Sequence, residues 1–245
     1  FIENAVKEYA GEGFRLGDED VPANRNVLVR NEATDNANHG FRVRIGQQNL
    51  LLLNHAEDNA TEGFRTQDGS NRFIANTAIG NGDEGFRLSD VAAQDSAVIG
   101  NTAEGKGLPE DNDQISCNFP PPEGEEPDIN PGIVTSNEAA DNKIIGNVTQ
   151  GNCVGIGVET GSQSNEITKN VAFDNRLIDL ADGNLDCDDN DWRINVFETS
   201  EDEIIGERRR QGGRGAIDHY GLAVDSLATL EAVKERLVAA GADIG

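Results

Sequence analysis

The chain is poor in aromatic and sulfur-containing residues. Of its 245 residues, aromatics make up 5% and all hydrophobic residues 36%, with one Trp, two Tyr and no Met. So few large apolar side chains argue against a thick globular core. No apolar run approaches the roughly 20 residues that a membrane-spanning helix needs. We therefore expect a thin core built from short elements, in a chain that does not span a membrane.

Positive charge is also scarce. The chain has 20 Lys and Arg against 45 Asp and Glu, a formal net charge of −25. This balance argues against nucleic acid as a partner, because phosphate binding needs clustered positive charge. An acidic surface with few Lys residues keeps a protein soluble where salt screens its self-repulsion. A halophilic source fits this composition, and so does an ordinary exported acidic protein.

Cysteine occurs three times, as Cys117, Cys153 and Cys187, which is too few for a disulfide-built scaffold and matches no zinc-binding spacing. One bridge with one further thiol would fit an extracytoplasmic setting, and three reduced, buried thiols are the alternative. The chain shows no signal peptide and begins at Phe1 inside a repeat. We expect it to be a processed or excised piece whose upstream part is missing.

A repeated tripeptide is the main positive feature. Gly-Phe-Arg occurs at residues 13–15, 40–42, 63–65 and 85–87, a period of 22 to 27 residues that indicates a repeat architecture. An Asn stands nine residues before each Gly, and its position continues along the chain: Asn4, Asn31, Asn54, Asn76, Asn101, Asn147, Asn170 and Asn195. Five residues further on, three of the four copies carry a second Asn, and the first copy carries Tyr9: Asn36, Asn59 and Asn81.

The residues between these positions alternate between apolar and polar over short stretches, as in β-strands. Each repeat is too short to hold a helix as well and cannot bury its apolar face alone, so neighbouring repeats must stack. We predict an all-β parallel β-helix of about eight coils, with equivalent residues about 4.8 Å apart. The Phe residues then form an internal stack. The Asn side chains form hydrogen-bonded ladders at turns whose left-handed backbone Asn tolerates.

Phrases such as NEATDNANHGFRV, NTAIGNGDEGFRL and NEITKNVAFDN resemble the right-handed, single-stranded parallel β-helix repeat superfamily. The resemblance covers residues 1–199, and the segment 179–197 looks like the closing coil of such proteins. The superfamily includes pectate-lyase-like enzymes and many exported surface proteins. The resemblance therefore implies the fold and leaves the activity open.

Two regions interrupt or follow the repeats. Six of the seven Pro residues fall between the fifth Asn and the next Gly-apolar pair, which predicts a Pro-rich insertion loop at 107–131. A loop of this length is often functional. A charged, Gly-rich linker at 200–216 precedes a strand-helix tail at 217–245 that resembles the opening of a vicinal-oxygen-chelate (glyoxalase-like) module. In that family the strand His is a metal ligand, which makes His219 a candidate; a surface or packing His is the alternative.

The Arg of each Gly-Phe-Arg copy should point outward, and together these residues would form a stripe: Arg15, Arg42, Arg65 and Arg87. Such a stripe could hold a uronate or a sulfated glycan through guanidinium–acid pairs. The alternative is a column of internal ion pairs, because three of the four Arg have a Glu three residues earlier, at Glu12, Glu62 and Glu84. Exposed ion pairs of this kind contribute little stability.

Other candidate sites are weaker. A run of Asp residues could bind Ca²⁺ through hard oxygen ligands, although chance crowding in so acidic a chain is the alternative; the candidates are Asp186, Asp188, Asp189 and Asp191. His39 and His55 fall in turns beside the ladder Asn residues and are expected to be solvated. Cys117 lies in the Pro-rich loop and Cys153 at the same corner one coil further on, so we predict a disulfide between them. No nucleophile–base pair stands out, and no catalytic residue is assigned.

Two functions of different classes follow. The first is a non-catalytic extracellular or cell-surface protein, a structural, adhesive or self-assembling scaffold whose partners are glycan or copies of itself. The second is a polysaccharide-active enzyme, a lyase, hydrolase or epimerase acting on an acidic glycan, with Ca²⁺ as the one cofactor considered. A third, smaller possibility is a metal-dependent role for the tail around His219.

Overall fold

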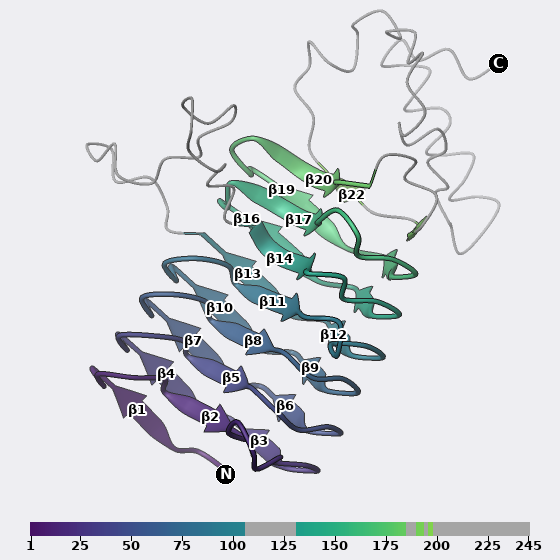
Figure 1. Ribbon diagram of the computed structural model, residues 1–245. Coiled ribbons are helices and arrows are strands. Elements are labelled where there is room, and N and C mark those ends of the chain that lie inside the picture. Colours follow the sequence, from purple (N-terminus) through teal and green to yellow (C-terminus); the bar gives the residue numbers. More distant parts are fainter. Residues whose placement is uncertain (106–130, 185–189, 194–195, 198–245) are drawn as a thin grey trace, which may run out of the picture.

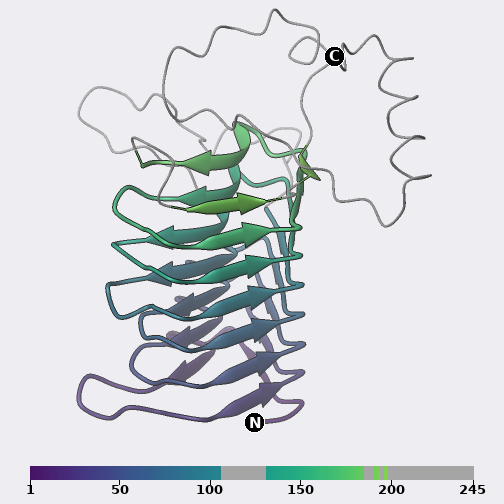
Figure 2. The same ribbon diagram turned by 90° about the vertical axis from the view of Figure 1, so that its right-hand side faces the viewer.

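The computed structural model describes residues 1–105, 131–184, 190–193 and 196–197. Within these residues the chain forms short β-strands and no helix, and it winds as a solenoid whose coils lie one above another (Figures 1 and 2). No helix in the described part is long and apolar enough to cross a membrane.

Each coil contributes one strand to each of three sheets. The first sheet contains β1 (Ala5–Lys7), β4 (Glu32–Thr34), β7 (His55–Glu57), β10 (Thr77–Ile79), β13 (Thr102–Glu104), β16 (Val148–Gln150), β19 (Val171–Phe173) and β22 (Val196–Phe197). The second contains β2 (Phe14–Leu16), β5 (Phe41–Val43), β8 (Phe64–Thr66), β11 (Phe86–Ser89), β14 (Pro131–Ser136), β17 (Val154–Val158) and β20 (Ile178–Asp182). The third contains β3 (Val27–Val29), β6 (Leu50–Leu52), β9 (Arg72–Ile74), β12 (Ala97–Ile99), β15 (Lys143–Ile145), β18 (Glu166–Thr168) and β21 (Asp191–Arg193).

All strand pairs within these sheets are parallel, and the register matches repeat to repeat, so that Phe41 pairs with Phe64 and Arg42 with Arg65. The second and third sheets are seven strands deep and the first is eight. The predicted all-β parallel β-helix of about eight coils is therefore confirmed. The linker at 200–216 and the tail at 217–245 lie outside the described residues. So does the insertion loop at 107–131, except Pro131, which opens β14.

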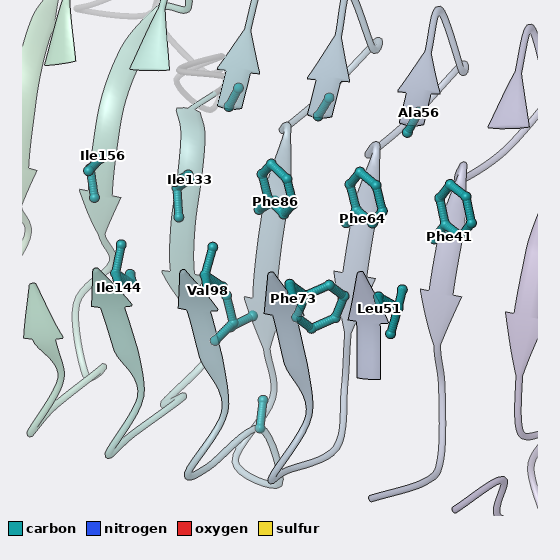
Figure 3. Close-up of a cluster of buried hydrophobic side chains, with 14 of the residues drawn as sticks. Phe41, Leu51, Ala56, Phe64, Phe73, Phe86, Val98, Ile133, Ile144 and Ile156 are labelled. Atoms are coloured by element: carbon teal, nitrogen blue, oxygen red, sulfur yellow. The ribbon is translucent and has the colours of Figure 1, made fainter. Parts of the chain in front are cut away.

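The core is a set of columns, one for each sheet. Phe14, Phe41, Phe64 and Phe86 stack with ring centroids 4.7–4.8 Å apart and interplanar angles of 3–5°. The stack continues in the following coils as Ile133 and Ile156, from right to left in Figure 3. Facing it from the third sheet are buried aliphatic residues and Phe73, which meets Phe64 edge-on. The predicted internal Phe stack is confirmed, because strand pairing fixes the same spacing for equivalent side chains.

Asn ladders join the coils at their corners. In the first ladder, the backbone N–H and side-chain Nδ2 of Asn54 both donate to Asn76 Oδ1, at 2.9 and 3.0 Å. This pattern runs from Asn4 to Asn170, and Asn195 lies outside the described residues. The second ladder, through Asn36, Asn59 and Asn81, is also as predicted.

The structure contains a third Asn ladder that the sequence analysis missed. It joins the turn before each strand of the third sheet, and Ser96 takes one place in it: Asn26, Asn49, Asn71, Asn142, Asn165 and Asn190. Each of the three corners of the coil therefore has an Asn ladder. Each buried Asn satisfies backbone and side-chain groups of adjacent coils, which removes polar groups that would otherwise be buried without partners.

The left-handed turn residues are not the ladder Asn residues. A positive φ falls instead on the residue immediately before the ladder position, such as Arg30 (52°), Leu53 (55°) and Ala75 (52°) in the first ladder. The prediction that Asn is present for its left-handed backbone was wrong. Asn is needed at these positions for its amide, which both donates and accepts.

Candidate functional site

A polar column runs along the entrance to the second sheet. The residues immediately before the Gly of each Gly-Phe-Arg copy are Glu12, His39, Glu62 and Glu84. They stack because each following Gly donates its N–H to the carbonyl of the next member of the column, as Gly40 does to Glu62 at 3.0 Å and Gly63 to Glu84 at 2.9 Å. One column of side chains therefore contains three carboxylic acids and one imidazole.

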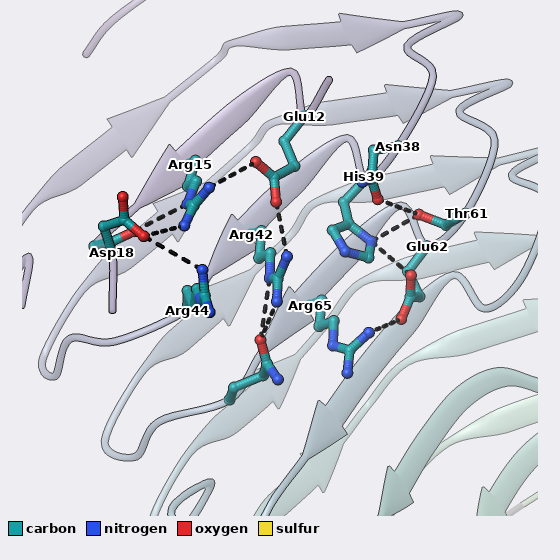
Figure 4. A network of polar contacts seen from close by, with 12 residues as sticks. Glu12, Arg15, Asp18, Asn38, His39, Arg42, Arg44, Thr61, Glu62 and Arg65 are labelled. Carbon is teal, nitrogen blue, oxygen red and sulfur yellow. Dashed lines mark hydrogen bonds and ion pairs between the residues drawn. The ribbon is translucent and has the colours of Figure 1, made fainter. Parts of the chain in front are cut away.

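The Arg residues stand beside this column on the outward face of the second sheet. Arg65 donates to Glu62 and Arg87 to Glu84, each at 2.9 Å. Arg42 has His39 three residues earlier, where the other copies have Glu, and it donates instead to Glu12 of the preceding coil at 2.8 Å (Figure 4). The predicted column of ion pairs is confirmed.

Pairing leaves the Arg stripe only partly accessible. The side chains of Arg42, Arg65 and Arg87 are 17%, 21% and 23% exposed, and that of Arg15 is 33% exposed. The proposed contact of this stripe with glycan stays a prediction. Arg65 Nε is buried and has no acceptor among the described residues.

His39 is buried rather than solvated, at 5% exposure. Its Nδ1 lies 2.6 Å from Glu62 Oε2 and 2.7 Å from the hydroxyl oxygen of Thr61 (Figure 4). The expectation that His39 is solvated was wrong, because stacking sets its ring between the Glu residues of its column. His55 also lies in a strand, β7, rather than in a turn, and it contacts Glu57 at 3.2 Å with 35% of its side chain exposed.

The two adjacent acids of the column, Glu62 and Glu84, have pKa values shifted in opposite directions. Burial opposes ionisation of Glu62, but the hydrogen bond from His39 and the positive charges of His39 and Arg65 outweigh it and lower its pKa to about 2. Burial raises the pKa of Glu84 to about 7, against the attraction of Arg87 and with added repulsion from Glu62 and Asp83. Near neutral pH Glu62 is therefore ionised, whereas its neighbour Glu84 is about half protonated.

A third acid completes this cluster, which we call the acidic pocket: Glu62, Asp83 and Glu84. One carboxylate oxygen from each lies within 4.8 Å of the others. Glu62 and Glu84 are buried, at 2% and 6% exposure, whereas Asp83 is exposed. Glu84 Oε1 accepts from Arg87, and no donor among the described residues reaches Glu84 Oε2, which is buried.

The other predicted site residues do not join this cluster. Asp191 opens β21 and forms an ion pair with Arg193. The remaining candidates lie outside the described residues: Cys117, Asp186, Asp188, Asp189 and His219. Cys153 is disulfide-bonded. Its pairing with Cys117 stays a prediction.

The sequence analysis paired each Glu of the acidic pocket with its Arg but did not bring the acids together. The available signal was their shared position, one residue before Gly in successive repeats. Once the repeats are stacked in register, that position places Glu62 next to Glu84 and His39 next to Glu62. The arrangement can hold a positively charged group or exchange a proton.

Comparison with known families supports the fold seen in the coordinates. The family described as right handed beta helix region matches residues 1–172. No curated protein and no solved structure matches the chain closely enough to identify a relative. Because the family match covers well over half of the sequence and the described strands form a parallel solenoid, this chain belongs to the right-handed β-helix family.

Proposed function

We propose that this β-helix is an exported, extracellular or cell-surface scaffold that associates end to end with copies of itself. The observation that supports the proposal best is the register of the coils, in which equivalent residues pair from coil to coil in all three sheets. A coil of another copy can extend this pairing, because a strand edge is a template for pairing with another chain. Among the described strands, β1, β2 and β3 each pair on one side, with a strand of the next coil.

The side chains at this edge suit an interface. Phe1 and Ile2 are each 66% exposed, and Tyr9 and Val27 are 58% and 48% exposed. The ring of Phe14 stacks on Phe41 at 4.8 Å and is not fully buried. Exposed apolar side chains that lie together mark candidate interaction surfaces, and the first residues of the chain lie beside β3, where the N-terminal amine of Phe1 donates to the carbonyl of Val27 at 3.0 Å.

The Asn ladder is also incomplete at this edge. Asn4 donates its N–H and Nδ2 to Asn31 Oδ1, at 3.0 Å each, and no donor among the described residues reaches Asn4 Oδ1. A strand added by a second copy would bring backbone and amide donors to this oxygen. Pairing of one copy's first coil with another copy's last coil is heterologous and so generates an open filament.

Net charge makes this association depend on salt. Copies that each carry a formal charge of −25 repel one another, and the repulsion is screened within about 8 Å at physiological ionic strength and within about 3 Å at 1 M. We therefore expect larger species at high salt than at low salt. An interface held together by salt bridges would show the opposite trend, with smaller species at high salt.

Sedimentation velocity at low and high salt tests the proposal. Val27→Lys places a charge on the exposed edge strand β3 and should keep the protein monomeric. Val91→Lys is the matched control, because Val91 is similarly exposed, at 53%, in a turn along the side of the solenoid. A wild-type protein that is monomeric at both salt concentrations, or a Val27→Lys variant that assembles as the wild type does, would contradict end-to-end assembly.

The second candidate function is action on an acidic polysaccharide. It is favoured by the Arg stripe, which runs coil by coil along the outward face of the second sheet beside the acidic pocket. Equally spaced guanidinium groups suit a polymer of uronate or sulfated sugars. Binding to and turnover of polyuronates such as pectin and alginate, with and without Ca²⁺, tests this candidate. If neither binding nor product formation is observed, the scaffold remains the supported function.

A further inference from the structure

Stacking brings two acidic side chains of the polar column next to each other. The register sets equivalent residues of adjacent coils face to face, so Glu62 must lie next to Glu84. Like charges opposite each other in a sheet are destabilising. His39 separates Glu12 from Glu62 and contacts Glu62 at 2.6 Å. No equivalent group of the column stands between Glu62 and Glu84.

Cationic groups stand beside these acids. Arg65 and Arg87 each hold one acid of the acidic pocket, at 2.9 Å, and His39 contacts Glu62 at 2.6 Å. Asp83 adds a third carboxylate.

Oxygen atoms remain available inside the acidic pocket. Arg87 holds Glu84 Oε1, whereas Glu84 Oε2 is buried and receives no hydrogen bond from any described residue. In Glu62, Oε1 accepts from Arg65 and Oε2 contacts His39. Glu84 is 6% exposed, so water reaches it poorly. A buried polar atom without a partner is destabilising, and a bound cation would offset that cost.

The geometry points to a divalent-cation site in which Glu62, Asp83 and Glu84 each supply one carboxylate oxygen, with Ca²⁺ as the fitting ion. Ca²⁺ takes oxygen ligands at about 2.3–2.6 Å in flexible geometry, so two ligands of one ion lie at most about 5 Å apart. The three oxygens meet this limit, since all lie within 4.8 Å of one another. Exposed Asp83 gives the ion access from solvent, and water completes the coordination.

A paramagnetic probe can locate the ion. Mn²⁺ added to the ¹⁵N-labelled chain, after treatment with a chelator, should broaden the amide signals of residues 62–65 and 83–87 first, and excess Ca²⁺ should restore them. Calorimetric titration with Ca²⁺ then gives the affinity. We expect Glu84→Gln and Asp83→Asn each to weaken Ca²⁺ binding at this site at least tenfold, because each removes a ligand charge.

Glu12→Gln is the matched control. Glu12 holds the same position in the first coil and pairs with Arg15 and Arg42, but its neighbour in the column is His39. In this variant, Mn²⁺ should broaden the same amide signals as in the wild type, and the affinity for Ca²⁺ should be unchanged. Circular dichroism checks that each variant is folded. Because Asp83 is exposed, Asp83→Asn leaves the buried packing intact. Unselective broadening, or broadening of these amides that survives Glu84→Gln, would overturn the site.

Discussion

The N-terminal coils (residues 1–105) and the C-terminal coils (residues 131–184 and 190–193) share one backbone but carry different faces. In the N-terminal coils the inward position of the second sheet is Phe and the outward position is Arg. At β14 the same two positions become Ile133 and Val134. From β17 to β20 the outward position is Gly157 and then Ala181. The polar column and its ion pairs therefore belong to the N-terminal coils.

What stays constant across both regions is the corner chemistry. An added Cβ at Gly63 would lie 2.8 Å from the ladder amide of Asn81, and one at Gly132 would lie 2.7 Å from that of Asn152. Both would also meet the carbonyl oxygen of the next coil's Gly at 2.9 Å. At these two positions only Gly leaves room for the ladder amide and for the backbone of the next coil. The constant residues build the solenoid, and the variable ones give each face its chemistry.

Truncation of the Phe stack should have the largest effect. Phe64→Ala removes a ring packed between two others, and we expect the free energy of unfolding to fall by about 4 kcal/mol. Phe64→Ile gives the N-terminal coils the side chain that the C-terminal coils use, and should cost about 1–2 kcal/mol because most of the volume is kept. Denaturant unfolding measures both. Equal losses for the two variants would show that ring stacking, rather than filled volume, holds this column.

The Asn ladder should respond equally in the two regions. Asn54→Ala and Asn147→Ala each remove a buried amide that bridges three coils. We expect each to lower the free energy of unfolding by about 3 kcal/mol, because backbone donors and acceptors lose their partners. Chemical denaturation checks the two values. A difference of more than about 1 kcal/mol between them would mean that the corners are not equivalent.

The acidic pocket gives the N-terminal coils a dependence on pH. When a chelator keeps the site free of metal ions, the pKa of Glu84 in the folded chain is about 7, compared with an ordinary value of 4.5. Its stabilising contribution is therefore complete below pH 4.5 and is lost as pH rises through 7. The loss is about 3 kcal/mol. Among the described residues, the charged or titratable groups around it are Glu62, His39, Arg65, Arg87 and Asp83.

Thermal unfolding of the wild type and Glu84→Gln between pH 4 and pH 8 measures this contribution. Gln stays neutral, so the variant should lack the loss between pH 4.5 and 7. Glu62 acts in the other direction: its pKa of about 2 contributes stability that is present above pH 4.5 and lost as pH falls through 2. If the stability of the wild type and of Glu84→Gln changes with pH in the same way, the pKa of Glu84 is the same in the folded and unfolded chain and the prediction is wrong.

The exposed end of the Arg stripe should matter least. Arg15 contacts Glu12 at 3.6 Å and also pairs with Asp18, at the most exposed position of the stripe. We expect Arg15→Gln to change the free energy of unfolding by about 0.5 kcal/mol or less. Arg65→Gln leaves buried Glu62 without its guanidinium partner and should cost more. Guanidinium denaturation of the two variants compares them; a larger loss from Arg15→Gln would reverse the expected order.

The candidate site could be predicted only in part. The spacing of Glu62 from Arg65 and of Glu84 from Arg87 predicted the ion pairs, because both partners lie on one strand and its preceding turn. The contact of His39 with Glu62 follows from their shared position before Gly in successive repeats, but the burial of both side chains could not be predicted, because it depends on how neighbouring coils pack around them. The third Asn ladder was missed because Asn26 and Asn49 stand outside the repeated tripeptide that set the frame.

The sequence by itself determined the solenoid, because a 22 to 27 residue period of Asn, Gly and Phe can bury its apolar positions only by stacking. It also determined which residues share a column. Tertiary structure alone decided the environment of each column: which acids lose their water, which oxygen of Glu84 has no partner, and which imidazole is enclosed. Those properties arise from burial and from charges brought together across coils, and neither is a property of any single repeat.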